Sequence, residues 1–261
     1  MIDDITSDVN WRDRVVALFQ ATAAQLSPRH ASIRDYRRLA AIQTFMYGRA
    51  RAMQVGVGDQ WRELGRLELL LLKHLGLRDG SFIMDVGCGS GRLAASLAAS
   101  SIAVDYHGSD VVPAFIRNAK RISPKHFRYT RVERIEIPEC DNCADFVTFF
   151  SVATHLQLHE TYVYLQEARR IAKPGGIIVV SFLDLGNPVH FQIFQKTAQN
   201  ASKGKLLLLN MFFDASALKN MAEHVGLVVQ DIFTAGIPFI PTDEGLEPFG
   251  QSVAVLRKEL Y

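Results

Sequence analysis

The chain has 261 residues, of which 48% are apolar and 21% are charged, and its formal net charge is +2. This composition excludes a disordered or collagen-like chain, and the small charge gives no electrostatic reason to expect a nucleic-acid partner. Three cysteines provide no disulfide framework. The N-terminal residues lack the basic and apolar pattern of a signal peptide, and no apolar run is long enough for a membrane span. We therefore expect a cytoplasmic protein without a membrane partner.

The first 78 residues predict a helical N-terminal extension. Apolar residues recur every three to four positions in two stretches, and a glycine at position 76 is typical of a helix end. The periodic positions are Val15, Phe19, Ala23, Leu26, Trp61, Leu64, Leu67, Leu71 and Leu75.

From residue 79 to residue 261, short apolar runs alternate with amphipathic stretches, which is typical of a parallel sheet covered by helices on both faces. The sequence predicts seven strands, at 81–86, 103–109, 127–132, 144–151, 177–182, 228–233 and 252–257. It predicts helices at 91–99, 113–121, 160–171 and 214–225. We interpret this part as one α/β domain with an insertion at about 187–213 that could form a lid.

A glycine-rich turn follows the first predicted strand and opens a helix. Gly87, Gly89 and Gly91 have the spacing G-x-G-x-G, whereas dinucleotide-binding turns use G-x-G-x-x-G to seat a pyrophosphate. Glycines let the main chain approach a ligand, and the free N–H groups at a helix start favour an anionic or carboxylate group. The next strand is followed by Asp110, and both hydroxyls of a ribose could donate to this carboxylate.

These residues resemble the first motif of the class I S-adenosylmethionine-dependent methyltransferase family, in which an acidic residue precedes G-x-G-x-G. Asp85 matches the acidic position. The segments 127–138, 143–151, 173–176 and 251–258 also resemble that family, so that the similarity covers about residues 61–258. The resemblance implies a Rossmann-like, seven-stranded, mostly parallel sheet in the order 3-2-1-4-5-7-6. It also implies S-adenosyl-L-methionine as the cofactor, above the carboxyl ends of strands one, two and four.

The resemblance further implies which residues bind the cofactor. Asp110 would bind the ribose, and Glu133 stands where an acidic residue often lies near the adenine amino group. The complete expected set is Asp85, Gly87, Cys88, Gly89, Gly91, Asp110, Val111, Glu133, Phe150 and Ser151.

His155 is the candidate general base. It follows the fourth strand, where the family builds the wall between cofactor and acceptor, and a base of near-neutral pKa helps to deprotonate a hydroxyl acceptor. The alternative is that His155 packs against or caps the next helix. Asp184 and His190 follow the fifth strand and are reserve candidates.

Two other chemistries are not expected. An amine-methylating [D/N/S]-P-P-[Y/F/W] motif does not follow the fourth strand. Cys140 and Cys143 form a C-x-x-C pair, but with Cys88 as the one further cysteine they cannot complete a four-cysteine zinc site, and we predict no metal.

The sequence thus predicts an S-adenosylmethionine-dependent methyltransferase that acts on a small-molecule acceptor. An oxygen of a sugar, glycan precursor or natural product is the leading hypothesis, by analogy with bacterial methyltransferases of such pathways. The alternatives are a methyltransferase that modifies RNA or protein, and a protein that binds the cofactor without catalysis.

Overall fold

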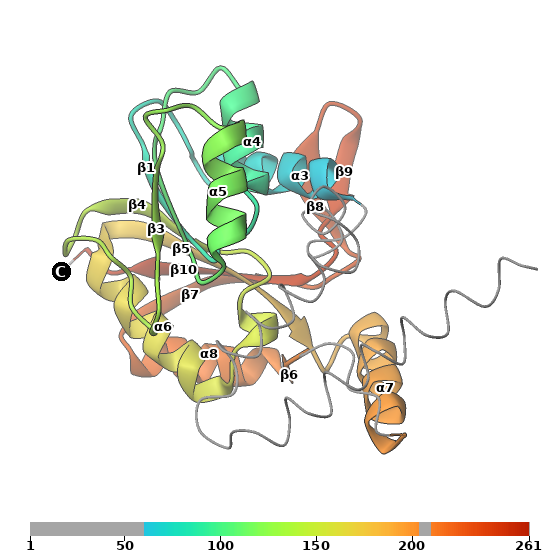
Figure 1. Cartoon of the computed structure of the whole chain (residues 1–261). Helices are drawn as coiled ribbons and strands as arrows, with labels where there is room; N and C mark the ends of the chain where they lie inside the picture. The colour runs from blue at the N-terminus through green and yellow to red at the C-terminus, as the bar shows by residue number, and fades with distance from the viewer. Residues whose placement is uncertain (1–59, 204–209, 261) are drawn as a thin grey trace, which may run out of the picture.

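The computed structural model describes residues 60–203 and 210–260 (Figure 1). The helix expected around residues 15–26 lies outside the described residues. The second periodic stretch forms α3 (Trp61–His74), whose apolar face buries Leu67, Leu71 and Leu72. Beyond the helix, Gly76 adopts a φ of 98°, which is a left-handed conformation typical of a glycine after a helix end.

The centre of the fold is a mixed sheet that confirms the predicted strand order. Its strands follow the order β3-β2-β1-β4-β5-β10-β7, and β10 runs antiparallel to both of its neighbours. Because β7 is the sixth predicted strand and β10 the seventh, this is the order 3-2-1-4-5-7-6. The strands are β1 (Phe82–Val86), β2 (Asp105–Asp110), β3 (Arg128–Arg131), β4 (Ala144–Phe149), β5 (Ala172–Asp184), β7 (Leu227–Phe233) and β10 (Ser252–Lys258).

Helices cover both faces of this sheet, as expected for buried central strands such as β1 (Figure 1). All five residues of β1 are buried. Leucines of α3 and α4 (Arg92–Ala99) share one core cluster, and α6 (Leu158–Ile171) and α8 (Ala215–His224) contribute to the cluster on the other face. In addition, α5 (Pro113–Ile122) lies beside α4 and packs its Phe115 against Val112.

The differences from the predicted strands include the start of β5 and an additional hairpin. β5 begins at Ala172 rather than at residue 177, because residues 173–176 continue the strand with a register shift against β4. A hairpin of β8 (Pro238–Thr242) and β9 (Gly245–Pro248) was not predicted. Its prolines interrupt the alternation by which a strand is recognised.

The insertion after β5 contains a helix that was not predicted from the sequence. Asn187 caps α7 (Pro188–Ser202), because its side-chain oxygen accepts hydrogen bonds from the N–H groups of Val189 and His190 at 2.9 and 3.2 Å. The helix projects from the sheet (Figure 1) and is followed, after an undescribed segment, by β6 (Phe212–Phe213), which pairs with β5. Within the described residues, no helix has the length and apolar character that a membrane crossing requires.

Candidate functional site

The glycine-rich turn joins β1 to α4, and its three glycines have different surroundings. All three adopt positive φ, with values of 68° for Gly87, 55° for Gly89 and 93° for Gly91. A Cβ at Gly87 would lie 2.5 Å from a methyl group of Val152, and a Cβ at Gly91 would lie 2.8 Å from the Cα of Ala119. A Cβ at Gly89 would meet nothing closer than the Gly87 carbonyl oxygen at 4.0 Å. Two glycines therefore permit close packing, and Gly89 faces open space.

Asp85 lies buried at the carboxyl end of β1. Its carboxylate accepts hydrogen bonds from the Tyr106 hydroxyl at 2.6 Å and from the Thr148 hydroxyl at 2.9 Å. These bonds connect β1 to β2 and β4, the two strands on either side of it. Burial raises the pKa of Asp85 to about 6, although both hydrogen bonds act in the opposite direction.

Asp110 is the last residue of β2, and its side chain bonds to the backbone of the glycine-rich turn. Its two carboxylate oxygens accept hydrogen bonds from the backbone N–H of Gly89 at 2.9 Å and of Val112 at 2.7 Å. Burial raises its pKa to about 6 as well. Val111 is a further backbone donor to this carboxylate. Because an ionised carboxylate has about four acceptor positions, at least one position is left for another donor.

The chain leaves β4 through a strained residue, Ser151, which has a φ of 61°. Its backbone N–H donates to the Ser181 hydroxyl at 2.7 Å, and the Ser181 hydroxyl donates to Oε1 of Gln251 at 2.6 Å. The Ser151 hydroxyl also donates to this Gln251 oxygen at 3.3 Å. This network holds the turn that leads into the short helix η1 (Ala153–His155), so that β5 and the segment before β10 fix the position of His155.

A cavity of about 290 Å³ lies between the glycine-rich turn and the segment after β4. Many predicted site residues line it: Asp85, Gly87, Cys88, Gly89, Phe150, Ser151 and His155. Four predicted residues do not line it: Gly91, Asp110, Val111 and Glu133. Glu133 is exposed and forms an ion pair with Arg131 at 2.6 Å. The reserve candidates Asp184 and His190 are also absent from the lining. His190 is buried and accepts a hydrogen bond from the backbone N–H of Asp184 at 2.9 Å.

A buried ion pair that was not predicted from the sequence lines the same cavity. Glu68 of α3 contacts Arg92, the first residue of α4, and the two residues are 1% and 6% exposed. The Nε atom of Arg92 has no hydrogen-bond partner within the described residues. A charged residue inside the apolar run 67–72 of α3 is the signal that could have identified Glu68. Gln251 was also missed, because it is brought to the site by tertiary structure alone.

The residues in and next to the cavity offer groups that suit a nucleoside with an amino-acid group and a positive charge. Gly89 leaves room for close approach of a ligand, and Asp110, which bonds to the Gly89 N–H but does not line the cavity, can accept a further donor such as a hydroxyl. The Nε–H of Arg92, which has no partner among the described residues, can donate to a ligand carboxylate. Glu68 and Asp85 add two carboxyl groups beside Arg92, and these groups favour a cationic ligand when they are ionised.

Comparisons with known proteins agree with this geometry. A family model described as a methyltransferase domain matches residues 84–180. An uncharacterized methyltransferase of Mycobacterium leprae is 30% identical over 150 residues, which are 57% of this chain and 47% of that protein. The ubiquinone/menaquinone biosynthesis C-methyltransferase UbiE of Syntrophotalea carbinolica is 28% identical over 144 residues, or 53% of this chain and 57% of that protein. The chain thus spans about half the length of the curated relatives it matches.

A solved structure shows the same fold. A SAM-dependent methyltransferase from Methanosarcina mazei superimposes with a TM-score of 0.57 at 17% identity, and the match covers 73% of this chain and 98% of that one. The strand order and the glycine-rich turn define a Rossmann-like methyltransferase fold. The chain contains a class I S-adenosylmethionine-dependent methyltransferase domain, and S-adenosyl-L-methionine is the cofactor of this class.

Proposed function

We propose that the protein is a cytoplasmic enzyme that transfers the methyl group of S-adenosyl-L-methionine to an oxygen of a small molecule. The observation that carries this proposal is that Gly89 of the cofactor turn and His155 line one cavity. The turn to which we assign cofactor binding and a side chain that can accept a proton therefore face the same space. The cavity volume of about 290 Å³ is near the lower end of the range for small-molecule sites.

Binding would be shared between the turn and the strand ends. Asp110 would accept hydrogen bonds from the ribose hydroxyls, while Arg92 would donate to the carboxylate at the methionine end. Val111 and Glu133 stand after β2 and β3, on the side of Asp110, and are the proposed contacts of the adenine. Phe150 is buried beside Phe249, with 6.0 Å between their ring centroids, and would form an apolar wall.

Catalysis would depend mainly on how the protein positions the acceptor relative to the methyl group. The cofactor supplies an electrophilic methyl group, and the protein must hold the acceptor in line with it while water is excluded. We assign His155 the role of taking the proton from an acceptor hydroxyl, a contribution of about 10² to 10⁴ in rate. The fixed turn at Ser151 and its bond to Ser181 would limit the movement of η1 and hold His155 in place.

Cavity size, net charge and resemblance are the support for the class of acceptor. The small cavity and the net charge of +2 favour a small molecule over RNA or a protein, and the preference for a sugar, glycan precursor or natural product comes from resemblance alone. Carbon is the second candidate for the accepting atom, because UbiE, the relative that is 28% identical, is named a C-methyltransferase.

Transfer of labelled methyl from S-adenosyl-L-methionine tests the proposal. The purified protein is incubated with the small-molecule, RNA and protein fractions of a lysate, and we expect label in the small-molecule fraction. His155→Ala should lower this transfer by about 10²-fold or more and leave cofactor affinity unchanged. The control is His159→Ala, because His159 is exposed on the first turn of α6. Label in RNA or protein would support the macromolecular alternative, and cofactor binding without any transfer would indicate a non-catalytic protein.

A further inference from the structure

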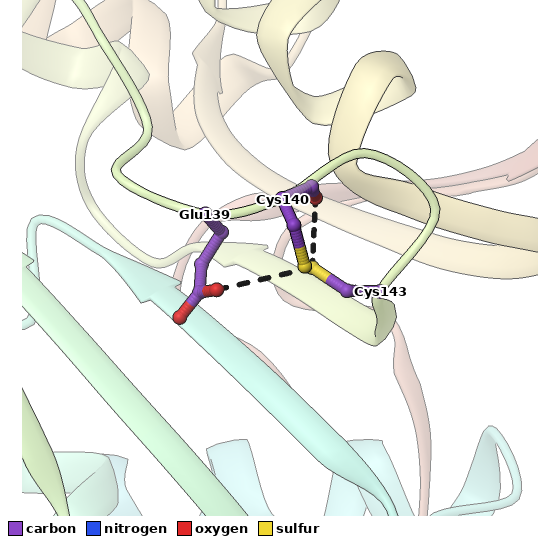
Figure 2. A group of neighbouring side chains, drawn as sticks. All are labelled: Glu139, Cys140 and Cys143. Carbon is purple, nitrogen blue, oxygen red and sulfur yellow. Dashed lines mark hydrogen bonds between the residues drawn. The ribbon is translucent and has the colours of Figure 1, made fainter.

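The loop between β3 and β4 brings together three side chains that can bind a metal ion. Glu139, Cys140 and Cys143 are shown in Figure 2, and their ligand atoms all lie within 4.8 Å of one another. Around a tetrahedral zinc ion, with bonds of about 2.0 to 2.3 Å, ligand atoms lie about 3.5 to 4 Å apart. Small side-chain rotations would therefore place the three atoms at bonding positions.

The carboxylate of Glu139 is oriented toward the two thiols by its neighbours. Its Oε1 atom accepts a hydrogen bond from Nη1 of Arg128 at 2.7 Å and contacts Nδ1 of His107 at 2.6 Å. The other ring nitrogen of His107 contacts the Thr130 hydroxyl at 2.8 Å, which fixes the ring. The second oxygen of Glu139, Oε2, lies 3.9 Å from the sulfur of Cys143. Groups that bind and orient a ligand in this way are typical of metal sites.

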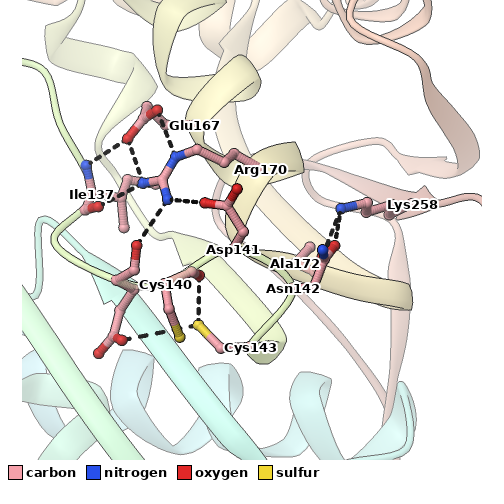
Figure 3. Close-up of polar contacts among 10 residues, drawn as sticks. Ile137, Cys140, Asp141, Asn142, Cys143, Glu167, Arg170, Ala172 and Lys258 are labelled. Carbon is pink, nitrogen blue, oxygen red and sulfur yellow. Dashed lines mark hydrogen bonds and ion pairs between the residues drawn. The ribbon is translucent and has the colours of Figure 1, made fainter.

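The backbone of the loop is held by the end of α6 (Figure 3). The guanidinium of Arg170 donates to the carbonyl oxygens of Ile137 and Glu139 at 2.9 and 2.8 Å and to the Asp141 carboxylate at 2.7 Å. Between the two cysteines, Asn142 has a φ of 55°, and Lys258 donates to its side-chain oxygen at 2.5 Å. The positions of both cysteines are thus set before any ligand binds, which lowers the entropic cost of binding.

We propose that Glu139, Cys140 and Cys143 bind one divalent cation of the zinc class. Two thiolates and one carboxylate are a ligand set that suits Zn²⁺, and a fourth position is left for water because Cys140 is exposed. The sequence-based prediction of no metal weighed the cysteines and the carboxylates of Asp141 and Asp184 separately, and Glu139, the oxygen ligand beside the two cysteines, was not counted. On binding, both thiols lose their protons to solvent.

The acidic groups of the loop lie close together, with Oε2 of Glu139 3.9 Å from the sulfur of Cys143. The thiol donates to the Cys140 carbonyl oxygen at 2.8 Å. A divalent cation would offset this crowding of acidic groups and deprotonate the thiols.

The site is separate from the cofactor cavity. Cys143 immediately precedes β4, whereas the cavity lies beyond the other end of this strand, at Phe150. Seven residues of extended chain span about 20 Å. We therefore assign the metal a structural role, in which it ties the β3–β4 loop to β2 and β3 through Glu139, His107 and Arg128.

Titration of the reduced, metal-free protein with Co²⁺ tests the proposal. We expect one equivalent to bind with a sulfur-to-cobalt charge-transfer band in the near ultraviolet, and Zn²⁺ should displace it. Cys140→Ser, Cys143→Ser and Glu139→Gln should each weaken binding by about 100-fold or more, and His107→Asn by about 10-fold. Cys140 is exposed, so its serine variant is expected to keep the fold.

Glu136→Gln is the matched control, because Glu136 is a partly exposed acidic residue of the same loop that pairs with Arg134 instead. Its Co²⁺ affinity should equal that of the unaltered protein. Failure of the reduced protein to bind Co²⁺, binding without the charge-transfer band, or equal affinity in the Cys140→Ser variant would each overturn the proposal. These measurements do not depend on methyl transfer.

Discussion

The carboxylate of Asp110 accepts a hydrogen bond from the backbone N–H of Gly89 at 2.9 Å, and this bond joins the end of β2 to the middle of the glycine-rich turn. Asp110 also accepts from the N–H of Val112 at 2.7 Å. One side chain thus holds the turn in its left-handed conformation and presents its remaining acceptor positions beside it. A loss of this carboxylate would affect the shape of the turn and the binding of a ribose together.

Asp110→Ala is predicted to weaken binding of S-adenosyl-L-methionine by about 5- to 150-fold, equivalent to about 1 to 3 kcal/mol. The reason is the loss of hydrogen bonds to an ionised acceptor and of the bond that positions Gly89. Isothermal titration calorimetry measures the change. Asp105→Ala, at the exposed start of the same strand, is the control and should bind normally. Equal affinity in the Asp110 variant would contradict the ribose assignment.

Cofactor affinity should also depend on pH. The pKa of Asp110 is raised to about 6 by burial, and the ionised form accepts hydroxyl donors best. Affinity is therefore expected to fall as the pH decreases from about 7 to about 5. Calorimetry across this range measures it, and Asp110→Asn, which does not titrate there, should show a weaker dependence. An identical pH profile in both proteins would exclude Asp110 as the titrating group.

Stability is predicted to change with pH in the opposite direction at Asp85. Because burial raises its pKa in the folded state from 3.8 to about 6, the folded protein binds a proton more tightly than the unfolded chain. The contribution of Asp85 to the free energy of unfolding is then greatest below about pH 4. It decreases by up to about 3 kcal/mol as the pH rises through about 6.

Urea denaturation of the unaltered protein and of Asp85→Asn at several pH values isolates this contribution. The stability of the unaltered protein relative to the variant should decline between about pH 4 and about pH 6 and stay level above. Carboxylates with lowered pKa, such as Glu63 and Glu167, are common to both proteins and cancel in the difference. A difference that rises with pH would show that the Asp85 pKa is lowered instead.

Gly89→Ala and Gly91→Ala should have separable effects, although both glycines have positive φ. Gly89→Ala adds a methyl group in open space, so the unfolding free energy should fall by about 1 to 2 kcal/mol while cofactor binding weakens. Gly91→Ala places its Cβ 2.8 Å from the Cα of Ala119 and must separate α4 from α5, with a loss of about 2 to 5 kcal/mol. Chemical denaturation and calorimetry on both variants test this order of stability, and the reverse order would refute it.

The sequence was sufficient to predict the sheet because its strands are locally distinctive. The buried run of β1, the glycines after it and Asp110 are close in sequence, so spacing alone relates them. In α7, by contrast, His190 is the one buried residue, and no apolar periodicity indicates the helix. The one local signal for this helix is its start, where Asn187 at the N-cap is followed by Pro188.

The composition of the cavity was less predictable for a physical reason. Glu68, Arg92 and Gln251 come from three distant segments and meet only when the sheet and its helices pack together. No regular spacing in the sequence relates these three residues. Glu139 was missed for the same reason, because its approach to the cysteines depends on His107 and Arg128 from β2 and β3.

The buried pair of Glu68 and Arg92 provides a last prediction. Burial raises the pKa of Glu68 to about 7 even though Arg92 acts to lower it, so the carboxylate depends on its partner to remain ionised. Arg92→Met should reduce the unfolding free energy by about 3 to 5 kcal/mol, because it leaves an unpaired acid in the interior. The double variant Glu68→Leu/Arg92→Met should recover most of this loss, because apolar side chains of similar volume replace both charges.

A double-mutant cycle with Glu68→Leu as the second single variant measures the coupling by chemical denaturation. Calorimetry with S-adenosyl-L-methionine separates stability from binding. The double variant should fold well and still bind weakly, since it lacks the Nε–H of Arg92, to which no described residue offers an acceptor. Normal affinity in the stable double variant would show that the pair supports the packing of α3 on α4 and takes no part in holding the cofactor.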